Sequence, residues 1–599
     1  MKQDRLSFTP RAAVQAWARG LCLGLALCGA GSALAAAPTA RPNILLLVGD
    51  DWGYSDVGAY GGEMRTPNLD ALARSGVQFS NFHVAASCSP TRAMLLTGVD
   101  NHLNGLGAMA DLRTAEQRAQ PGYEGHLNDR VVTIASLLRD NGYFTAIAGK
   151  WHLGEAPENL PGARGFERSF VMLDGGADNW EQRPWKPAEE GHWVEDGQPA
   201  SLPEDFYSST FIVDRAIDYI DQATQAGKPF FSYVAFQAIH MPVQAPRSFS
   251  DHYRGRYDAG WNALRAERQA RAKALGLVPA DSAMRPISMA PEWAELDAET
   301  RRDQARRMEV YAGMAEAADA EIGRLLDHLR ANGQLDNTII LFLSDNGGEG
   351  LDPHAVPLFR WWLRGNYSER TEDLGDKGAF AFIGPGWASA AVSPLSTFKQ
   401  WAGEGALRTP LIISGVPGMP AGRLEQSFAH VTDIMPTLLE LAGVAAPKGE
   451  YDGRAVQPLR GRSMLPLLQG KTQQLYAADQ PVGYELHGNA ALFRGDFKLV
   501  KNLPPMGDGQ WHLYDIRRDP GEVHDLRDAR AELFAALQAD YRQYAEAYQV
   551  VPVPDDYDYR QQGVVNSLRS LLFSYAPWGG AGLAGLVLLV WLYRRRRRG

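Results

Sequence analysis

Four short, nearly continuous apolar runs stand out along the first part of the chain. They occupy residues 44–48, 144–149, 230–236 and 339–343. Runs of this length without alternation are typical of strands buried on both faces, as in a parallel sheet covered by helices. Three of them follow stretches with helical spacing of apolar residues, at 131–142, 209–224 and 306–332. Helix followed by buried strand, repeated, predicts an α/β fold with a mostly parallel central sheet flanked by helices.

The pattern changes near residue 476, where short stretches alternate between apolar and polar positions. They lie at 482–487, 490–495, 497–502 and 511–516, and a helical pattern follows at about 529–548. Such alternation is typical of strands with one face in solvent. We therefore expect a main domain at 36–475 and a smaller C-terminal subdomain at 476–555, built from an antiparallel sheet and one helix. Residues 549–577 show no strong periodicity and are predicted to be a packed or linking tail, with the linker at 556–578.

The N-terminal residues have the pattern of an export signal. Positive charges precede a short apolar core, and an Ala-x-Ala site follows, so residues 1–35 are predicted to be a signal peptide. The alternative is an uncleaved anchor. It is disfavoured because the apolar core is shorter than the ~20 residues that a bilayer span needs.

The C-terminal segment 579–599 combines an apolar run at 581–593 with arginines at 594–598. With Gly579 and Gly580 in front of the run, it resembles the GlyGly-type sorting signals of Gram-negative bacteria, which an intramembrane protease cuts. A permanent transmembrane anchor and a soluble peptide are the alternatives. The pattern predicts membrane contact through the tail, a sorting protease as partner, and a location in the periplasm or at the cell surface.

The composition fits a large globular enzyme and excludes one class of partner. Apolar residues make up 45% and charged residues 22% of the chain, which is ordinary for a protein with a large core. The net charge is -10 and the isoelectric point is near 5.8. Because proteins that bind nucleic acid need a basic surface to displace counterions, we expect no nucleic-acid partner.

Polar residues follow the predicted buried strands. Asp50 and Asp51 end the first run, and Asp345 and Asn346 end the last. The other two runs are followed by Lys150, His152 and His240. In sheets of this kind ligands bind beyond the carboxyl ends of the strands. Four oxygen ligands suit Ca²⁺ or Mg²⁺, although each acidic pair taken alone could simply be a turn.

Cys88 has no possible disulfide partner in the mature chain. The chain holds three cysteines, and the other two lie inside the predicted signal peptide. The string Cys-Ser-Pro-Thr-Arg from Cys88 to Arg92, continuing to Leu-Leu-Thr-Gly, resembles the signature of type I sulfatases, and the order of the other motifs matches that family from Asn43 to about Leu526. The resemblance implies an alkaline-phosphatase-like fold and oxidation of Cys88 to formylglycine by a formylglycine-generating enzyme. A small buried hydrophobic residue is the alternative.

The resemblance also implies a reaction and a role for each residue. One hydroxyl of the hydrated aldehyde attacks the sulfur of a sulfate ester and expels the alcohol, and the second hydroxyl then drives release of sulfate. The implied metal ligands are Asp50, Asp51, residue 88, Asp345 and Asn346. The implied catalytic residues are Cys88 as nucleophile, Arg92 to steady the hydrate, Lys150 and Lys399 to bind sulfate oxygens, His152 to assist elimination, and His240 as acid toward the leaving group.

The long segment 351–398 resembles the bacterial arylsulfatase branch of the family. It carries Phe359, Trp361, Trp362, Phe380, Phe382 and Trp387. These aromatic residues would suit an apolar or aryl leaving group, or they only pack the segment. We expect a hydrolase of small-molecule or glycan sulfate esters, with aryl sulfates as the leading class.

Two other functions remain open. A formylglycine-dependent phosphodiester or phosphonate monoester hydrolase is disfavoured because such enzymes commonly have His where Asn346 stands. An inactive protein that only binds sulfated glycans is disfavoured by the complete set of ligands and the intact motif at Cys88.

Overall fold

The computed structural model describes residues 41–187, 189–554, 556–575 and 591. The predicted signal peptide, 1–35, lies outside the described residues, as does the predicted tail 579–599 apart from Trp591. Within the described ranges, none of the helices is long and apolar enough to cross a membrane. The transmembrane expectation is therefore not met by any described helix and rests on the tail alone.

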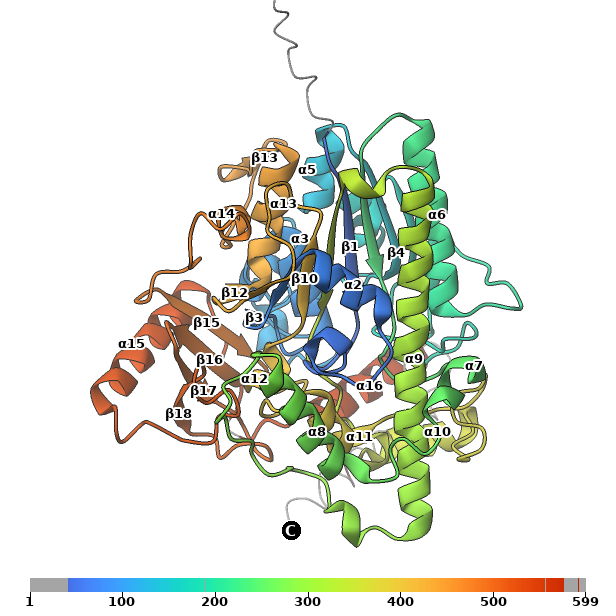
Figure 1. Cartoon of the computed structure of the whole chain (residues 1–599), viewed down its shortest axis with the longest axis vertical. Helices are drawn as coiled ribbons and strands as arrows, with labels where there is room; N and C mark the ends of the chain where they lie inside the picture. Colours follow the sequence, from blue (N-terminus) through green and yellow to red (C-terminus); the bar gives the residue numbers. More distant parts are fainter. Residues whose placement is uncertain (1–40, 188, 555, 576–590, 592–599) are drawn as a thin grey trace, which may run out of the picture. The chain divides into compact units, whose positions relative to one another are not determined.

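A ten-stranded sheet forms the centre of the fold (Figure 1). Its middle strands run parallel to one another, in the order β9 (Thr338–Ser344), β1 (Asn43–Gly49), β8 (Phe230–Ala235), β4 (Phe144–Lys150) and β5 (Arg168–Met172). Antiparallel pairs flank them, through β10 (Leu411–Ser414) with β2 (Val77–Phe79) on one side, and β6 (Trp193–Glu195) with β7 (Gln198–Pro199) on the other. At the edge, β11 (Arg423–Glu425) runs parallel to β2. The predicted mostly parallel sheet is confirmed.

Strand β1 is buried on both faces, which explains its unbroken apolar sequence. Ile44, Leu46 and Val48 point into one core, and Leu45 and Leu47 point into the other. Each fully buried side chain of this size contributes about 1.5–3 kcal/mol. The first core is covered by α3 (Cys88–Thr97), α5 (Ile134–Asp140) and α13 (Ile434–Ala442), and the second by α6 (Ser208–Gln225) and α9 (Ala298–Ala331) (Figure 1).

The C-terminal subdomain is the predicted small antiparallel sheet with one helix. Its strands follow chain order, as β15 (Pro481–Leu486), β16 (Asn489–Arg494), β17 (Phe497–Lys501) and β18 (Trp511–Asp515). Helix α15 (Ala531–Ala547) packs Leu537 and Tyr544 against the side chains of Leu492, Leu499 and Leu513. One face of the sheet therefore packs on this small core. The other face was predicted to lie in solvent, but its residues Ala491, Phe493 and Val500 pack on the core of the main domain.

The structure differs from the prediction of a linker in the segment 556–578. Of the two possibilities, a packed or a linking tail, the structure has the packed one, because residues Tyr559–Tyr575 form helix α16, which bonds to the rest of the chain. The helix lacks a regular apolar stripe because its inner face bonds to a loop and lines a pocket instead of packing on a continuous core. Sequence periodicity detects a helix face that packs on a continuous apolar core, but it does not detect a face that bonds to a loop and lines a pocket.

The aromatic segment 351–398 contains α10 (Pro357–Asn366) and α11 (Gly384–Ala391). Its aromatic residues divide between the two roles that the sequence left open. Trp387 is fully buried in the main core, Phe380 and Phe382 pack in a smaller cluster, and Phe359 from that cluster also lines a pocket. Trp361 does neither and is 75% exposed.

Candidate active site

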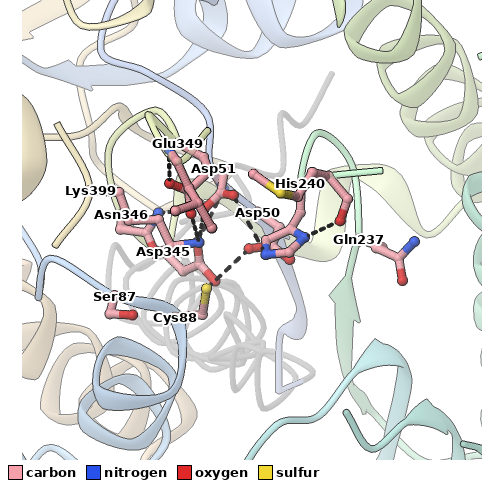
Figure 2. Close-up of polar contacts among 12 residues, drawn as sticks. Asp50, Asp51, Ser87, Cys88, Gln237, His240, Asp345, Asn346, Glu349 and Lys399 are labelled. Atoms are coloured by element: carbon pink, nitrogen blue, oxygen red, sulfur yellow. Dashed lines mark hydrogen bonds and ion pairs between the residues drawn. The ribbon is translucent and has the colours of Figure 1, made fainter. Parts of the chain in front are cut away.

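The carboxyl ends of β1, β4 and β9 meet at one edge of the sheet. Asp50 and Asp51 follow β1, Lys150 ends β4, Asp345 and Asn346 follow β9, and Cys88 begins helix α3. Ligand atoms of Asp50, Asp51, Cys88 and Asp345 all lie within 4.8 Å of one another. Figure 2 shows this cluster with Lys399 on one side and His240 on the other. The fold thus assembles one site from residues that are far apart in the sequence.

The cluster has the chemistry of a site for a divalent cation. Burial raises the pKa of Asp50, and it raises the pKa of Asp51 to about 8. Asp51 Oδ2 and Asn346 Oδ1 are buried without a hydrogen-bond partner, and such groups are costly unless something binds them. An ion with two positive charges would satisfy both oxygens and offset the crowded carboxylates. The donor set therefore fits Ca²⁺ or Mg²⁺.

Three buried cations surround the carboxylates. Lys150 Nζ lies 2.6 Å from Asp50 Oδ2, and Lys399 Nζ lies 2.6 Å from Asp51 Oδ1. Arg92 donates from Nε to Asp345 Oδ2 at 2.8 Å and from Nη1 to the Lys150 carbonyl at 3.0 Å. Burial disfavours the charge on Lys399, but the Asp51 carboxylate outweighs it and raises the pKa of the lysine. The cations therefore stay charged and face the point where an anionic substrate would bind.

Cys88 lies at the N-terminus of α3 with its Sγ 3.4 Å from Asp50 Oδ1. The side chain is 1% exposed, and it is the one free cysteine among the residues that the structure describes. Burial raises the pKa of its thiol well above the usual range. A buried neutral thiol beside a carboxylate has none of the features of a reactive thiolate.

Two histidines complete the predicted set. His240 Nδ1 donates to the Met241 carbonyl at 2.5 Å, so Nε2 faces the cluster, 3.8 Å from Asp51 Oδ2. Burial and the nearby lysines hold the pKa of His240 well below its usual range. His152 has a left-handed backbone, with φ of 55°, and lines the same pocket. All ten residues that the sequence singled out are therefore in or beside one site.

The sequence did not identify the glycine pair that supports the histidines. A Cβ atom at Gly176 would lie 3.1 Å from the ring atoms Cε1 and Nδ1 of His240, and one at Gly175 would lie 3.1 Å from His152 Cε1. Both glycines follow strand β5, so the pair after a buried strand was the available signal. Side chains at these positions would displace the two rings.

The loop that carries Lys399 is held by the C-terminal subdomain, which the sequence also did not predict. Gln400 has a φ of 80° and donates from its backbone to the Ala86 carbonyl at 2.8 Å. Asn489 donates to the Gln400 carbonyl at 3.0 Å, and the His487 ring lies 3.1 Å from Gln400 Oε1. The small sheet therefore positions a residue of the site directly.

An open pocket lies over the cluster and encloses about 910 Å³ of empty space, solvent at its mouth included. Its floor holds Cys88, His152, His240 and Lys399. Its walls are largely apolar and include Met109, Leu112, Trp185, Leu351, Val356, Phe359 and Val564. The Trp185 ring meets the His240 ring edge to face, with centroids 4.8 Å apart. The space beside His240 is therefore apolar and aromatic.

A second cavity adjoins the first and has the opposite character. It shares Asp111, His152, Gly175, Lys186, Pro187 and Ser567 with the apolar pocket. Its other lining residues include Arg113, Arg118, Glu124, Glu155, Asp174 and Arg569. His240 lines only the apolar pocket of the two. The site therefore opens toward an apolar space on one side and a charged space on the other.

Two family sequence models and several known proteins match this chain. The sequence model described as Sulfatase matches residues 42–444, and the one described as N-sulphoglucosamine sulphohydrolase, C-terminal, matches residues 397–547. An uncharacterized sulfatase of Schizosaccharomyces pombe is 38% identical over 538 residues, which cover 87% of this chain and 96% of that protein. An arylsulfatase of Klebsiella aerogenes is 36% identical over 446 residues, which cover 73% of this chain and 94% of that protein.

Solved structures share the fold at lower identity. The crystal structure of Ps i-CgsB in complex with k-i-k-neocarrahexaose has a TM-score of 0.62 and 24% identity, covering 89% of this chain and 98% of that one. The structure of BT4656 in complex with D-glucosamine-2-N,6-O-disulfate has a TM-score of 0.56 and 22% identity, covering 86% and 100%. The predicted fold class is confirmed.

Proposed function

The chain belongs to the sulfatase family and hydrolyses sulfate esters, and we propose that its preferred substrates are aryl sulfates, converted to a phenol and inorganic sulfate. The apolar pocket beside His240 is the observation that carries this proposal. An aromatic leaving group would replace water along those walls and gain the free energy of apolar burial. The arylsulfatase of Klebsiella aerogenes, 36% identical to this chain, supports the same substrate class.

The surroundings of His240 favour an aryl leaving group over a glycan. In our proposal His240 Nε2 acts as the acid toward the oxygen that leaves. Because burial and the lysines hold the pKa of the ring low, Nε2 must take up a proton before it can give one. A sugar leaving from this point would place its hydroxyls against Trp185 and Phe359. Polar groups buried without partners cost about 1–3 kcal/mol each. The charged cavity would suit a sugar better, but His240 does not line it.

The remaining residues have roles in binding and orientation. Lys150 and Lys399 lie on either side of the carboxylates and would bind the sulfate oxygens. Arg92 fixes Asp345 and the end of β4, so it holds the site together in addition to steadying residue 88. Fixed cations of this kind stabilise negative charge as it spreads over the oxygens in the transition state.

Two groups complete the site in our proposal. A divalent cation held by Asp50, Asp51, Asp345, Asn346 and residue 88 would polarise the sulfate oxygens and acidify the attacking hydroxyl. Conversion of Cys88 to formylglycine would supply a geminal pair of hydroxyls, one to attack sulfur and one to drive the release of sulfate. The proposal requires this conversion, because burial raises the pKa of the Cys88 thiol and leaves the unmodified side chain a weak nucleophile.

A substrate panel tests the proposal. The enzyme is produced together with a formylglycine-generating enzyme, loaded with Ca²⁺, and assayed on phenyl sulfate, glucose 6-sulfate, bis(4-nitrophenyl) phosphate and the phosphonate monoester 4-nitrophenyl phenylphosphonate. We expect kcat/KM for phenyl sulfate to exceed the others by about 100-fold or more. A preference for glucose 6-sulfate would overturn the aryl assignment, and a preference for the phosphorus esters would overturn the reaction.

We also propose that the protein is exported to the periplasm or cell surface and that its tail is cut near Gly580. The support comes from the sequence patterns at 1–35 and 579–599, outside the described residues. Cell fractionation tests the location, and the intact mass of the exported protein tests the cut. Recovery of the arginines at 594–598 on the mature form would favour a permanent anchor.

A further inference from the structure

Helix α16 lies beyond the residues that the family models match, which end at residue 547. Even so, Tyr559, Gly563, Val564 and Ser567 line the pocket over Cys88. We propose that α16 is a specificity element of this enzyme, which restricts the leaving group to a flat apolar body and excludes bulkier and hydroxylated ones. The inference deepens the proposed aryl sulfatase function and rests on it.

The helix is fixed to the rest of the pocket by buried polar contacts. Asn566 donates to the backbone carbonyl groups of Asp111 and Arg113, at 2.7 and 3.1 Å. Tyr557, just before the helix, donates to the Leu112 carbonyl at 2.9 Å. Because Asp111 and Leu112 also line the pocket, α16 and this loop form one continuous wall. Helix α16 is therefore part of the site and not a loose extension.

Gly563 sets how closely the wall is packed. A Cβ atom at this position would lie 3.3 Å from Leu112 Cδ2, closer than side chains usually pack. The adjacent Val564 lines the pocket, whereas Val565 is 38% exposed and does not. Two neighbouring valines on one helix thus face the pocket and the solvent respectively.

The charged groups along the apolar pocket are paired with one another. Lys186 Nζ lies 2.8 Å from Asp111 Oδ2 and 2.9 Å from Glu189 Oε1. Arg560 Nε lies 3.2 Å from Asp558 Oδ1, and Glu349 Oε2 lies 3.2 Å from Lys399 Nζ. Each of these charges is therefore already offset by a neighbour in the wall. The wall therefore offers a leaving group mainly apolar contact.

Helix α16 contributes side chains to both cavities. Its residues Tyr559 and Val564 line the apolar pocket, Asn566 and Arg569 line the charged cavity, and Ser567 lines both. Because His240 lines only the apolar pocket, a leaving group beside it meets the part of the helix that carries Tyr559 and Val564. This arrangement gives α16 an effect on which esters fit, and not only on stability.

The matched valines provide the test. For the variants Val564→Trp and Val565→Trp, kcat/KM is measured on phenyl sulfate and on the wider 4-methylumbelliferyl sulfate. Metal content and thermal unfolding show whether each variant is folded. We expect Val564→Trp to lower kcat/KM for the wider ester by about tenfold or more relative to phenyl sulfate. Val565→Trp should leave the ratio of the two esters unchanged. Equal ratios in the two variants would overturn the role of α16.

A second variant keeps the test decisive if Val564→Trp does not fold. Asn566→Leu removes the contacts that fix the helix, and we expect it to reduce the preference for phenyl sulfate over glucose 6-sulfate by about tenfold. An equal loss for both esters would mean that α16 is only structural. If the wild-type enzyme itself prefers glucose 6-sulfate, the proposed function fails; if it prefers aryl esters and both variants keep its ratios, only the inference about α16 fails.

Discussion

At the scale of single residues, burial decides which form of residue 88 can react. The Cys88 side chain is 1% exposed, and burial raises the pKa of its thiol. A thiol without its thiolate attacks slowly. The hydroxyl that we propose at this position, beside Asp50, the two lysines and the proposed cation, would need no full charge before it attacks. A substitution at residue 88 can also test the roles of the two proposed hydroxyls one at a time.

We expect Cys88→Ser to bind substrate, react once and stop. Serine leaves one hydroxyl near the carboxylates and lysines, so attack on the ester is still possible. No second hydroxyl is present to expel the sulfo group, so release of the alcohol should reach at most about one equivalent per enzyme. Mass spectrometry should find the sulfo group on the introduced serine. Continuous turnover with free sulfate would show that regeneration needs no geminal hydroxyl.

Asp345 should be necessary for metal binding. Asp345→Ala removes one of the few carboxylates in the cluster and also leaves the Arg92 guanidinium without its closest partner. We expect bound metal to fall below half of the wild-type content and kcat/KM to fall by about 100-fold or more. Elemental analysis of the purified variant measures the first quantity and a phenyl sulfate assay the second. Normal activity in a metal-depleted variant would contradict the assignment.

The sequence could identify the residues at the strand ends but not those that support them. Asp50 and Asp345 directly follow long apolar runs, so their place at one sheet edge follows from the parallel fold. Gly176 and Asn489 act through contacts with residues far away in the chain, on His240 and on the loop of Lys399. Such contacts depend on packing, which periodicity does not encode.

At the scale of elements, a buried histidine joins the short helix α4 (Asn101–Asn104) to strand β15. His102 Nδ1 lies 3.0 Å from Asp100 Oδ1, and Nε2 lies 2.8 Å from Glu485 Oε2. Burial disfavours the charged ring, but the hydrogen bonds to Asp100 and Glu485 outweigh it and raise the pKa of His102 from 6.5 to about 9. The protonated histidine therefore stabilises the contact between these elements.

This contact should weaken at alkaline pH. Because the pKa is higher in the folded state, the stabilisation is fully present below pH 6.5 and is lost as the pH rises toward about 9. The shift corresponds to about 3 kcal/mol. We expect the Tm advantage of the wild type over His102→Gln to be large at pH 6 and small at pH 9.5. Parallel Tm curves for the two proteins would show that His102 is not charged in the fold.

The sequence predicted those elements whose surroundings repeat regularly from residue to residue. Strand β1 packs on two cores, and the C-terminal strands alternate between residues of the small core and residues that pack on the main core, so each gives a regular pattern. Helix α16 meets a loop, a pocket and solvent within 17 residues. A pattern averaged over three environments shows no period, which is why the segment resembled a linker.

At the scale of the whole molecule, buried charges connect the C-terminal sheet to the main domain. Lys498 of β17 is fully buried, with Nζ 2.9 Å from Glu404 Oε1 and 2.9 Å from Glu522 Oε1. Glu404 also lies 3.2 Å from the His83 ring. Removing one member of such a network leaves uncompensated buried charge.

We therefore expect Lys498→Met to destabilise the protein although methionine fills similar space. Two buried carboxylates would lose their cation, a change that costs about 3–5 kcal/mol. The Tm should fall by about 5 °C or more. Lys501→Met, on the same strand but only half-buried, is the matched control and should change the Tm little. An equal effect of the two substitutions would show that the network is not important for stability.

Because α16 closes one side of the pocket and lies far after Cys88 in the sequence, the pocket is completed late in synthesis. At ~5–20 residues per second, residue 559 is synthesised about 25 to 95 s after residue 88. Until α16 docks, the part of the pocket wall that it forms is absent, so the modifying enzyme that we propose would have a wider path to Cys88 during this interval. In our proposal, the order of synthesis would thus separate the period in which residue 88 is processed from the period in which the complete pocket selects a substrate.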